Sequence, residues 1–118
     1  MPVKPRTRAG SGRTLIGSSD ISRVLREGSR RTGRVLVVYA FPSGRTTRAG
    51  YASPRSIGGA VARNRVRRLM REAWRAVQGS VREGFDVMIV GRPEVRGASL
   101  DEVATDLERL LEEAGVTA

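Results

Sequence analysis

The residues of this chain that could do chemistry are concentrated between residues 62 and 75, where arginines recur at short intervals. The segment reads Ala62-Arg63-Asn64-Arg65-Val66-Arg67-Arg68-Leu69-Met70-Arg71-Glu72-Ala73-Trp74-Arg75. A guanidinium keeps its charge and presents five N–H donors in a planar fork, which suits it to phosphate groups and base edges. An asparagine amide can also donate to a phosphate or contact a base edge. The residue types therefore predict binding of a polyanion.

A helix over residues 60–77 would sort these side chains onto two opposite faces. At about 100° per residue, the apolar stripe would consist of Val66, Leu69, Met70, Ala73 and Val77. The opposite arc would carry Asn64, Arg67, Arg68, Arg71 and Arg75, with Arg63 and Arg65 at its edges and Trp74 at the boundary, its indole N–H in water. Neighbouring like charges repel by a few tenths of a kcal/mol per pair. A bound phosphate backbone would make the arrangement favourable. The alternative interpretation is a helix face that is rich in arginine and contacts only solvent.

The charge of the chain is large and unevenly distributed. The 118 residues carry a net charge of +10, and Lys4 is the only lysine. From residue 99 onward six acidic residues stand against one arginine, a net −5, so the first 98 residues carry +15. A polyanionic partner follows, because each neutralised phosphate releases condensed counterions. A coding bias toward arginine could explain the choice of arginine over lysine but not the clustering.

Cysteine and histidine are both absent from the sequence. Their absence excludes disulfides, Cys/His zinc sites and the Ser-His-Asp and Cys-His types of nucleophilic machinery. A cysteine-free chain fits a reducing cytoplasm. The apolar runs at residues 35–41 and 85–90 are too short to span a bilayer, and the N-terminus lacks the apolar segment of a secretory signal. We therefore expect a cytoplasmic protein that does not associate with membranes.

Periodicity and turn residues predict the elements that would position the arginines. Residues 1–14 are predicted to be a disordered basic arm, and residues 15–118 one domain. A first helix should begin near residues 18–20 and end at Gly28, and a last helix should run from a capping box at residues 99–102 to Gly115. The strands are predicted at residues 34–41, 46–53 and 85–90. The order α-β-β-α-β-α indicates a single α+β domain, with a mixed sheet covered by helices.

The stretch from Ser53 to Arg75 resembles the signature of the bacterial ribonuclease P protein component. The core of that signature is an Arg-Asn-Arg triplet, two further basic residues and an Arg-Glu-Ala run, which here are residues 63–65, 67–68 and 71–73. The likeness extends more loosely over residues 15–113. It implies a ribosomal protein S5 domain 2-like fold with a left-handed crossover through the arginine helix, whereas general rules favour a right-handed one.

The resemblance also implies a function. The protein would bind the ribonuclease P RNA and the 5′ leader of precursor tRNA during tRNA 5′ maturation. The RNA subunit would carry the Mg²⁺-dependent endonuclease site, so Mg²⁺ would be held mainly by RNA, and no catalytic residue and no protein partner are assigned. By position, and with Arg75 added from the helical face, the RNA-binding residues would be Arg63, Asn64, Arg65, Arg67, Arg68, Arg71, Arg75, Arg48 and Arg55. The leader cleft would be lined by Ile21, Leu25 and Tyr39.

The sequence departs from the pattern of this family at several positions. Ile21 and Leu25 stand where the family commonly has phenylalanines in the leader cleft. Stacking on an aromatic side chain is worth about 1–3 kcal/mol per base, and these two positions lack that means of discriminating the leader. Ser56 replaces a usual basic residue, Gly59 a usual asparagine and Pro54 a common small polar residue.

Three other functions are compatible with parts of the sequence. A ribosomal or other structural RNA-binding protein could use the same basic helix. A protein nuclease would need acidic metal ligands, for which the candidates are Glu72, Asp86 and Glu94. Ion pairing is a better explanation for Glu72 and Asp86 than metal binding. The expected partner of Glu72 is Arg68 or Arg75. A DNA-binding regulator ranks last, because no second helix is spaced for a helix-turn-helix and no zipper heptads are present.

Overall fold

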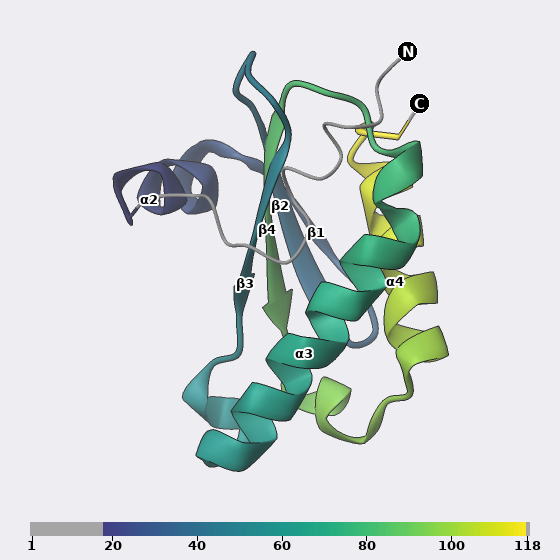
Figure 1. Cartoon of the computed structure of the whole chain (residues 1–118). Helices are drawn as coiled ribbons and strands as arrows, with labels where there is room; N and C mark the ends of the chain where they lie inside the picture. Colours follow the sequence, from purple (N-terminus) through teal and green to yellow (C-terminus); the bar gives the residue numbers. More distant parts are fainter. Residues whose placement is uncertain (1–17, 118) are drawn as a thin grey trace.

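The computed structural model describes residues 18–117, which form one sheet with helices on both of its faces (Figure 1). In chain order the elements are α2 (Ser18–Glu27), β1 (Ser29–Thr32), β2 (Leu36–Pro42), β3 (Arg48–Ala52), α3 (Ala60–Val77), β4 (Phe85–Gly91) and α4 (Leu100–Glu113). Short 3-10 turns, η2 (Arg55–Ile57), η3 (Gln78–Ser80) and η4 (Pro93–Gly97), lie between them. The three predicted helices and three predicted strands are confirmed, and the predicted arm at residues 1–14 lies outside the described residues.

One strand, β1, was not predicted. Its sequence, Ser-Arg-Arg-Thr, contains no apolar residue. β1 pairs only with β2 and therefore forms an edge of the sheet. An edge strand does not have to bury apolar side chains on both faces, and charged side chains are common there. The hydrophobic pattern that reveals buried strands is therefore missing from β1.

The sheet is mixed, with the strand order β1-β2-β4-β3. β2 pairs with β1 and with β4 in the antiparallel sense, whereas β3 and β4 are parallel. In Figure 1 β3 and β4 both run downward, and α3 returns between them on the side of the sheet that also carries α4. This connection is a left-handed crossover, as the resemblance implied and against the general preference for right-handed ones.

The main core lies between the sheet and the pair α3 and α4. Four residues of the predicted stripe of α3 are buried in it, and Leu69 is half-buried against it. α4 contributes Val103, Leu107, Leu110 and Leu111 from its own apolar stripe. The prediction for Trp74 was wrong: its side chain is buried in this core, and its indole N–H has no hydrogen-bond partner among residues 18–117.

Side chain–backbone hydrogen bonds fix the position of α4. Its predicted capping box is present, with Ser99 and Glu102 each accepting the backbone N–H of the other at 3.2 and 2.9 Å. One turn further on, the buried Asp106 carboxylate accepts the backbone N–H groups of Arg34 at 3.2 Å, Val35 at 2.9 Å and Leu36 at 3.1 Å. A Cβ on Gly33 would lie 2.5 Å from that carboxylate, so only glycine permits this approach. α4 is therefore tied to the loop before β2, and α3 packs beside it.

The opposite face of the sheet is covered by α2 (Figure 1). Val24 of α2 and Met88 of β4 form a small second core. Partly buried apolar side chains from α2, β2 and β3 pack around it, namely Ile21, Tyr39, Phe41 and Ala52. This smaller cluster makes the face beside α2 less completely covered than the face beside α3 and α4.

Candidate nucleic-acid interface

The outer face of α3 presents the arginines that its sequence predicted. Asn64, Arg65, Arg68 and Arg75 are exposed, and Arg63, Arg67 and Arg71 are half-buried. The separation of α3 into an apolar and an arginine-rich face is therefore confirmed. These seven residues are called the arginine face below.

Within residues 18–117, no arginine of the arginine face forms an ion pair with a carboxylate. Glu72 lies on the same helix but forms no ion pair in this part of the chain, so its expected pairing with Arg68 or Arg75 was wrong. The side chains of Arg68 and Arg75 also make no hydrogen bond to the described residues. Among residues 18–117, the fold thus leaves several positive charges on one helix face without a paired acid.

Two of the three half-buried arginines, Arg67 and Arg71, are held by uncharged groups. Arg67 donates from Nη1 to Asn64 Oδ1 at 3.0 Å and from Nη2 to the Ser53 hydroxyl at 3.2 Å. The Arg71 guanidinium lies over the Tyr51 ring, 5.8 Å from its centroid. Burial raises the pKa of Tyr51 to about 12, and the nearby charges of Arg71 and Arg75 act in the opposite direction. Such contacts orient a guanidinium and leave its full charge in place.

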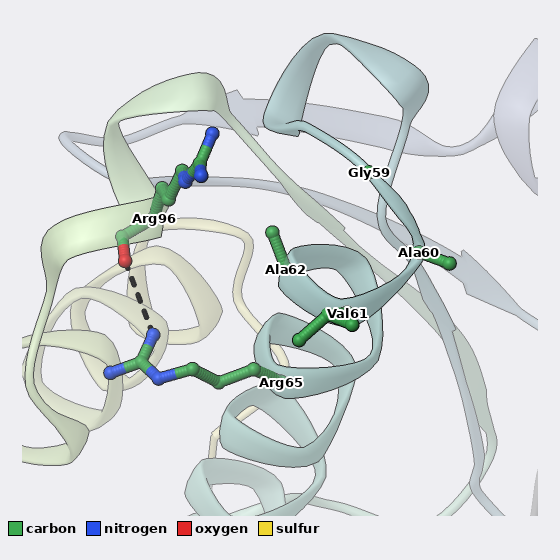
Figure 2. Close-up of a pocket in the computed structure, with 6 residues that line it drawn as sticks. All are labelled: Gly59, Ala60, Val61, Ala62, Arg65 and Arg96. Atoms are coloured by element: carbon green, nitrogen blue, oxygen red, sulfur yellow. Dashed lines mark hydrogen bonds between the residues drawn. The ribbon is translucent and has the colours of Figure 1, made fainter.

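At the start of α3 a pocket of about 460 Å³ opens between the segment 59–62 and η4. Figure 2 shows Arg65 reaching across it, where its Nη1 donates to the Arg96 carbonyl at 3.1 Å. The Arg96 guanidinium in turn donates to the Ile57 carbonyl at 3.2 Å. Arg55 lies just before this point, exposed on η2. Two further arginines thus lie near the first turn of α3, of which Arg96 was not predicted as a site residue.

Arg48 is placed differently from the other predicted RNA-binding residues. Its guanidinium donates to Asp86 through Nε at 2.9 Å and through Nη2 at 2.7 Å, and Nη2 also lies 3.2 Å from Asp20. The hydrogen bond with Asp86 raises the pKa of Arg48 against the effect of burial. The side chain is 17% exposed and is occupied within the fold. We therefore leave Arg48 out of the interface proposed below.

The same contacts account for Asp86. Its ion-pair interpretation is confirmed, with Arg48 as the close partner and Arg45 at 3.8 Å. The described part of the chain holds no group of three acidic, cysteine or histidine side chains that could bind a metal ion. Among these residues there is likewise no helix both long and apolar enough to cross a membrane.

The predicted leader-cleft residues come together only in part. Ile21 and Tyr39 are half-buried and pack against the Val24 and Met88 cluster, between α2 and the sheet. Leu25 is 42% exposed and is not part of that cluster. Phe41 was not predicted but belongs to it, and the Arg23 guanidinium lies 6.0 Å from its ring centroid.

The fold and the arginine face define a small basic α+β domain, whose helix α3 presents arginines that pair with no carboxylate in the described part of the chain. The family model described as Ribonuclease P matches residues 11–115. The ribonuclease P protein component of Caldanaerobacter subterraneus is 35% identical over 98 residues, which cover 82% of this chain and 84% of that protein. That of Acidothermus cellulolyticus is 37% identical over 100 residues, covering 82% and 83%. The chain belongs to the ribonuclease P protein component family.

Solved structures carry the same fold. The RNase P protein from Thermotoga maritima superposes with a TM-score of 0.76 at 25% identity, covering 86% of this chain and 96% of that one. An RNase P protein structure from Staphylococcus aureus gives a TM-score of 0.77 at 23% identity, covering 88% and 96%. The family resemblance and the fold inferred from the sequence are thus confirmed, and the family assignment replaces the alternative classes considered above.

Proposed function

We propose that this chain acts in tRNA 5′ maturation by binding the ribonuclease P RNA through the arginine face of α3. The observation that carries the proposal is the absence, among the described residues, of any carboxylate paired with these arginines. A helix surface of this kind is unfavourable alone, and phosphates of a folded RNA would supply the missing negative charge. Arg55 lies at the same end of the molecule as the start of α3 and extends the basic surface.

The protein would assist the reaction electrostatically. Mg²⁺ prefers oxygen ligands such as carboxylates and phosphate oxygens. None of the seven residues of the arginine face is acidic, so this face supplies no carboxylate to a Mg²⁺ site. The RNA subunit is therefore expected to hold most of the Mg²⁺ and to hydrolyse the phosphodiester. The arginines lower the repulsion between two RNA molecules whose phosphates crowd together. The holoenzyme is expected to work in the cytoplasm.

The 5′ leader of precursor tRNA is assigned to the less covered sheet face beside α2. Tyr39 could stack on a base or hydrogen-bond a sugar there, next to Ile21. Leu25, with its exposed side chain, would extend the apolar wall only at the rim. Because α2 offers aliphatic rather than aromatic side chains to this face, stacking on α2 should contribute little to leader selection, and Tyr39 of β2 would be the stacking residue.

The decisive experiment combines the purified protein with a ribonuclease P RNA at low Mg²⁺ and measures precursor-tRNA cleavage. The wild-type protein should raise the rate, whereas the double variant Arg68→Gln/Arg75→Gln should raise it less. Arg34→Gln is the control, because Arg34 is exposed and lines a pocket with acidic residues of α4 and with no residue of the arginine face. Cleavage at the mature 5′ end by protein free of RNA, or no rise with the wild type, would overturn the proposal.

The salt dependence of RNA binding tests the arginine face directly. Each phosphate contact that is lost should flatten the log–log salt dependence by about 0.7–0.9. The double variant should therefore show a slope smaller by up to about 1.4–1.8, and Arg34→Gln should keep the wild-type slope. A wild-type slope in the double variant would exclude Arg68 and Arg75 from the RNA interface.

A further inference from the structure

A buried hydroxyl links the end of the sheet to two residues of the arginine face. Ser53 lies just after β3 and is 8% exposed. Its Oγ donates to the Arg63 carbonyl at 3.0 Å and accepts a hydrogen bond from Arg67 Nη2 at 3.2 Å. Arg67 also donates from Nη1 to Asn64 Oδ1 at 3.0 Å. Four residues thus form one connected set of hydrogen bonds.

The direction of each hydrogen bond in this set is fixed by chemistry. A guanidinium has five N–H donors and no acceptor. The Ser53 hydroxyl must therefore accept from Arg67, and its single proton is left for the Arg63 carbonyl. For the same reason the amide of Asn64 must turn its oxygen toward Arg67. Only one of the two possible orientations of this amide satisfies Arg67.

The consequence is an oriented donor on the protein surface. With Oδ1 facing Arg67, the Asn64 NH₂ group points away from it, and it makes no hydrogen bond to the described residues. Asn64 is exposed and lies among the arginines of α3. An amide held in this way presents N–H donors, and not its carbonyl, to whatever approaches the face.

We propose that Ser53 is a positioning residue for RNA binding, acting through Arg67 to hold the Asn64 NH₂ group outward as a donor. Its target would be a hydrogen-bond acceptor on the ribonuclease P RNA, either a phosphate oxygen or a base atom. This inference rests on the proposed function and adds a residue that has no charge and touches no RNA. Preorganisation of Arg67 lowers the conformational entropy lost when the interface forms.

A double-mutant cycle in the full chain tests whether Ser53 acts through Arg67. RNA affinity is measured for Ser53→Ala, Arg67→Ala and the double variant. Ser53→Ala should weaken binding roughly 3–10-fold, the range for one hydrogen bond. In the Arg67→Ala background it should have almost no further effect, and Ser53→Thr should restore affinity. Equal losses in both backgrounds, with urea denaturation showing folded protein, would reduce Ser53 to a structural role and overturn the inference.

The orientation of Asn64 is tested by an exchange of its donor for an acceptor. Asn64→Asp keeps an oxygen for Arg67 but replaces the outward NH₂ by a second oxygen. It should bind RNA more weakly than Asn64→Ala, which removes both the NH₂ group and the oxygen that accepts from Arg67 but adds no outward acceptor. Binding of Asn64→Asp as tight as wild type would overturn the outward donor.

Analogue interference identifies the acceptor, with phosphorothioates probing backbone oxygens and 7-deazapurines probing a base nitrogen. An interference signal lost with Asn64→Ala protein supports the proposal and names its target; a pattern unchanged for both analogues counts against it. Arg68→Gln distinguishes failure of the proposed function from failure of the inference about Ser53, because Arg68 is outside the hydrogen-bond network of Ser53. If Arg68→Gln weakens RNA binding and Ser53→Ala does not, only the inference about Ser53 fails; if the wild-type protein does not bind the RNA, the proposed function itself fails.

Discussion

Arg48 on β3 and the arginines on the outer face of α3 lie in opposite electrostatic surroundings. Arg48 is clamped by Asp86 and also reaches Asp20, so its charge is neutralised inside the fold. Arg68, on the outer face of α3, has no carboxylate partner among residues 18–117. The sequence marked both as RNA-binding candidates. The difference lies in the acids that the fold places beside each arginine, and not in the side chain itself.

The sheet register explains why Arg48 was captured. Arg48 on β3 and Asp86 on β4 are direct partners in the parallel pair, so their side chains lie side by side on one face. Asp20 is brought to the same place by the first turn of α2. On α3, by contrast, the side chains one turn from Arg68 include Arg65 and Arg71. One environment stabilises the fold, and the other leaves charge for a partner.

The largest expected effect comes from breaking the neutralised group. Asp86→Ala should lower the free energy of unfolding by about 3 kcal/mol or more, because it removes the closest charged partner of the mostly buried Arg48. Urea denaturation measures the change. RNA affinity, measured where the variant is still folded, should remain close to wild type.

The matched control replaces both partners by apolar residues. Arg48→Met/Asp86→Leu should cost less stability than Asp86→Ala alone, since no unpaired charge stays buried. If Asp86→Ala changed stability by less than about 1 kcal/mol, the pair would behave like an exposed ion pair and the comparison with α3 would lose its basis.

Most elements of the fold could be predicted because their signals are local. The bounds of α3 follow from its apolar period, and the start of α4 follows from the Ser99–Glu102 capping box. β1 could not be found, because a short polar edge strand acquires its structure from its partner. The left-handed crossover was available only through the family resemblance, since general chirality rules favour the opposite hand.

The candidate site was predictable where it lies on one helix and not where it depends on distant residues. The arginine face follows from spacing within α3. The links from Arg48 to Asp86, from Ser53 to Arg67 and from Arg96 to Ile57 join positions 14 to 39 residues apart. Trp74 shows a related limit, because periodicity placed it at a boundary while the packing of α4 beside α3 completed a core that buries it.

Arg71 lies in a third kind of environment, over the aromatic ring of Tyr51. The stability of the protein at high pH tests this environment. The ordinary pKa of tyrosine is about 10, and that of Tyr51 in the fold is raised to about 12. A raised pKa means that the folded state holds the proton more tightly, so this stability is present below about pH 10 and lost as pH rises toward 12. Tyr51→Phe should therefore lose less stability than wild type over that range. Urea midpoints at several pH values measure the difference, and parallel curves for the two proteins would contradict the assignment.

The smallest expected effect concerns the stability of the arginine face itself. Arg68→Gln removes repulsion from Arg65 and Arg71 and keeps a side chain of similar length. Glu72 is also one turn away but forms no ion pair with Arg68, so less attraction than repulsion should be lost. The substitution should raise the free energy of unfolding by a few tenths of a kcal/mol at low salt. The gain should shrink as salt screens exposed charges, whereas Arg34→Gln, beside the acids of α4, should show no such gain. Thermal unfolding at two salt concentrations measures both. A loss of stability in Arg68→Gln would mean that Arg68 contributes to the fold, as Arg48 does, and would remove the contrast between the two groups.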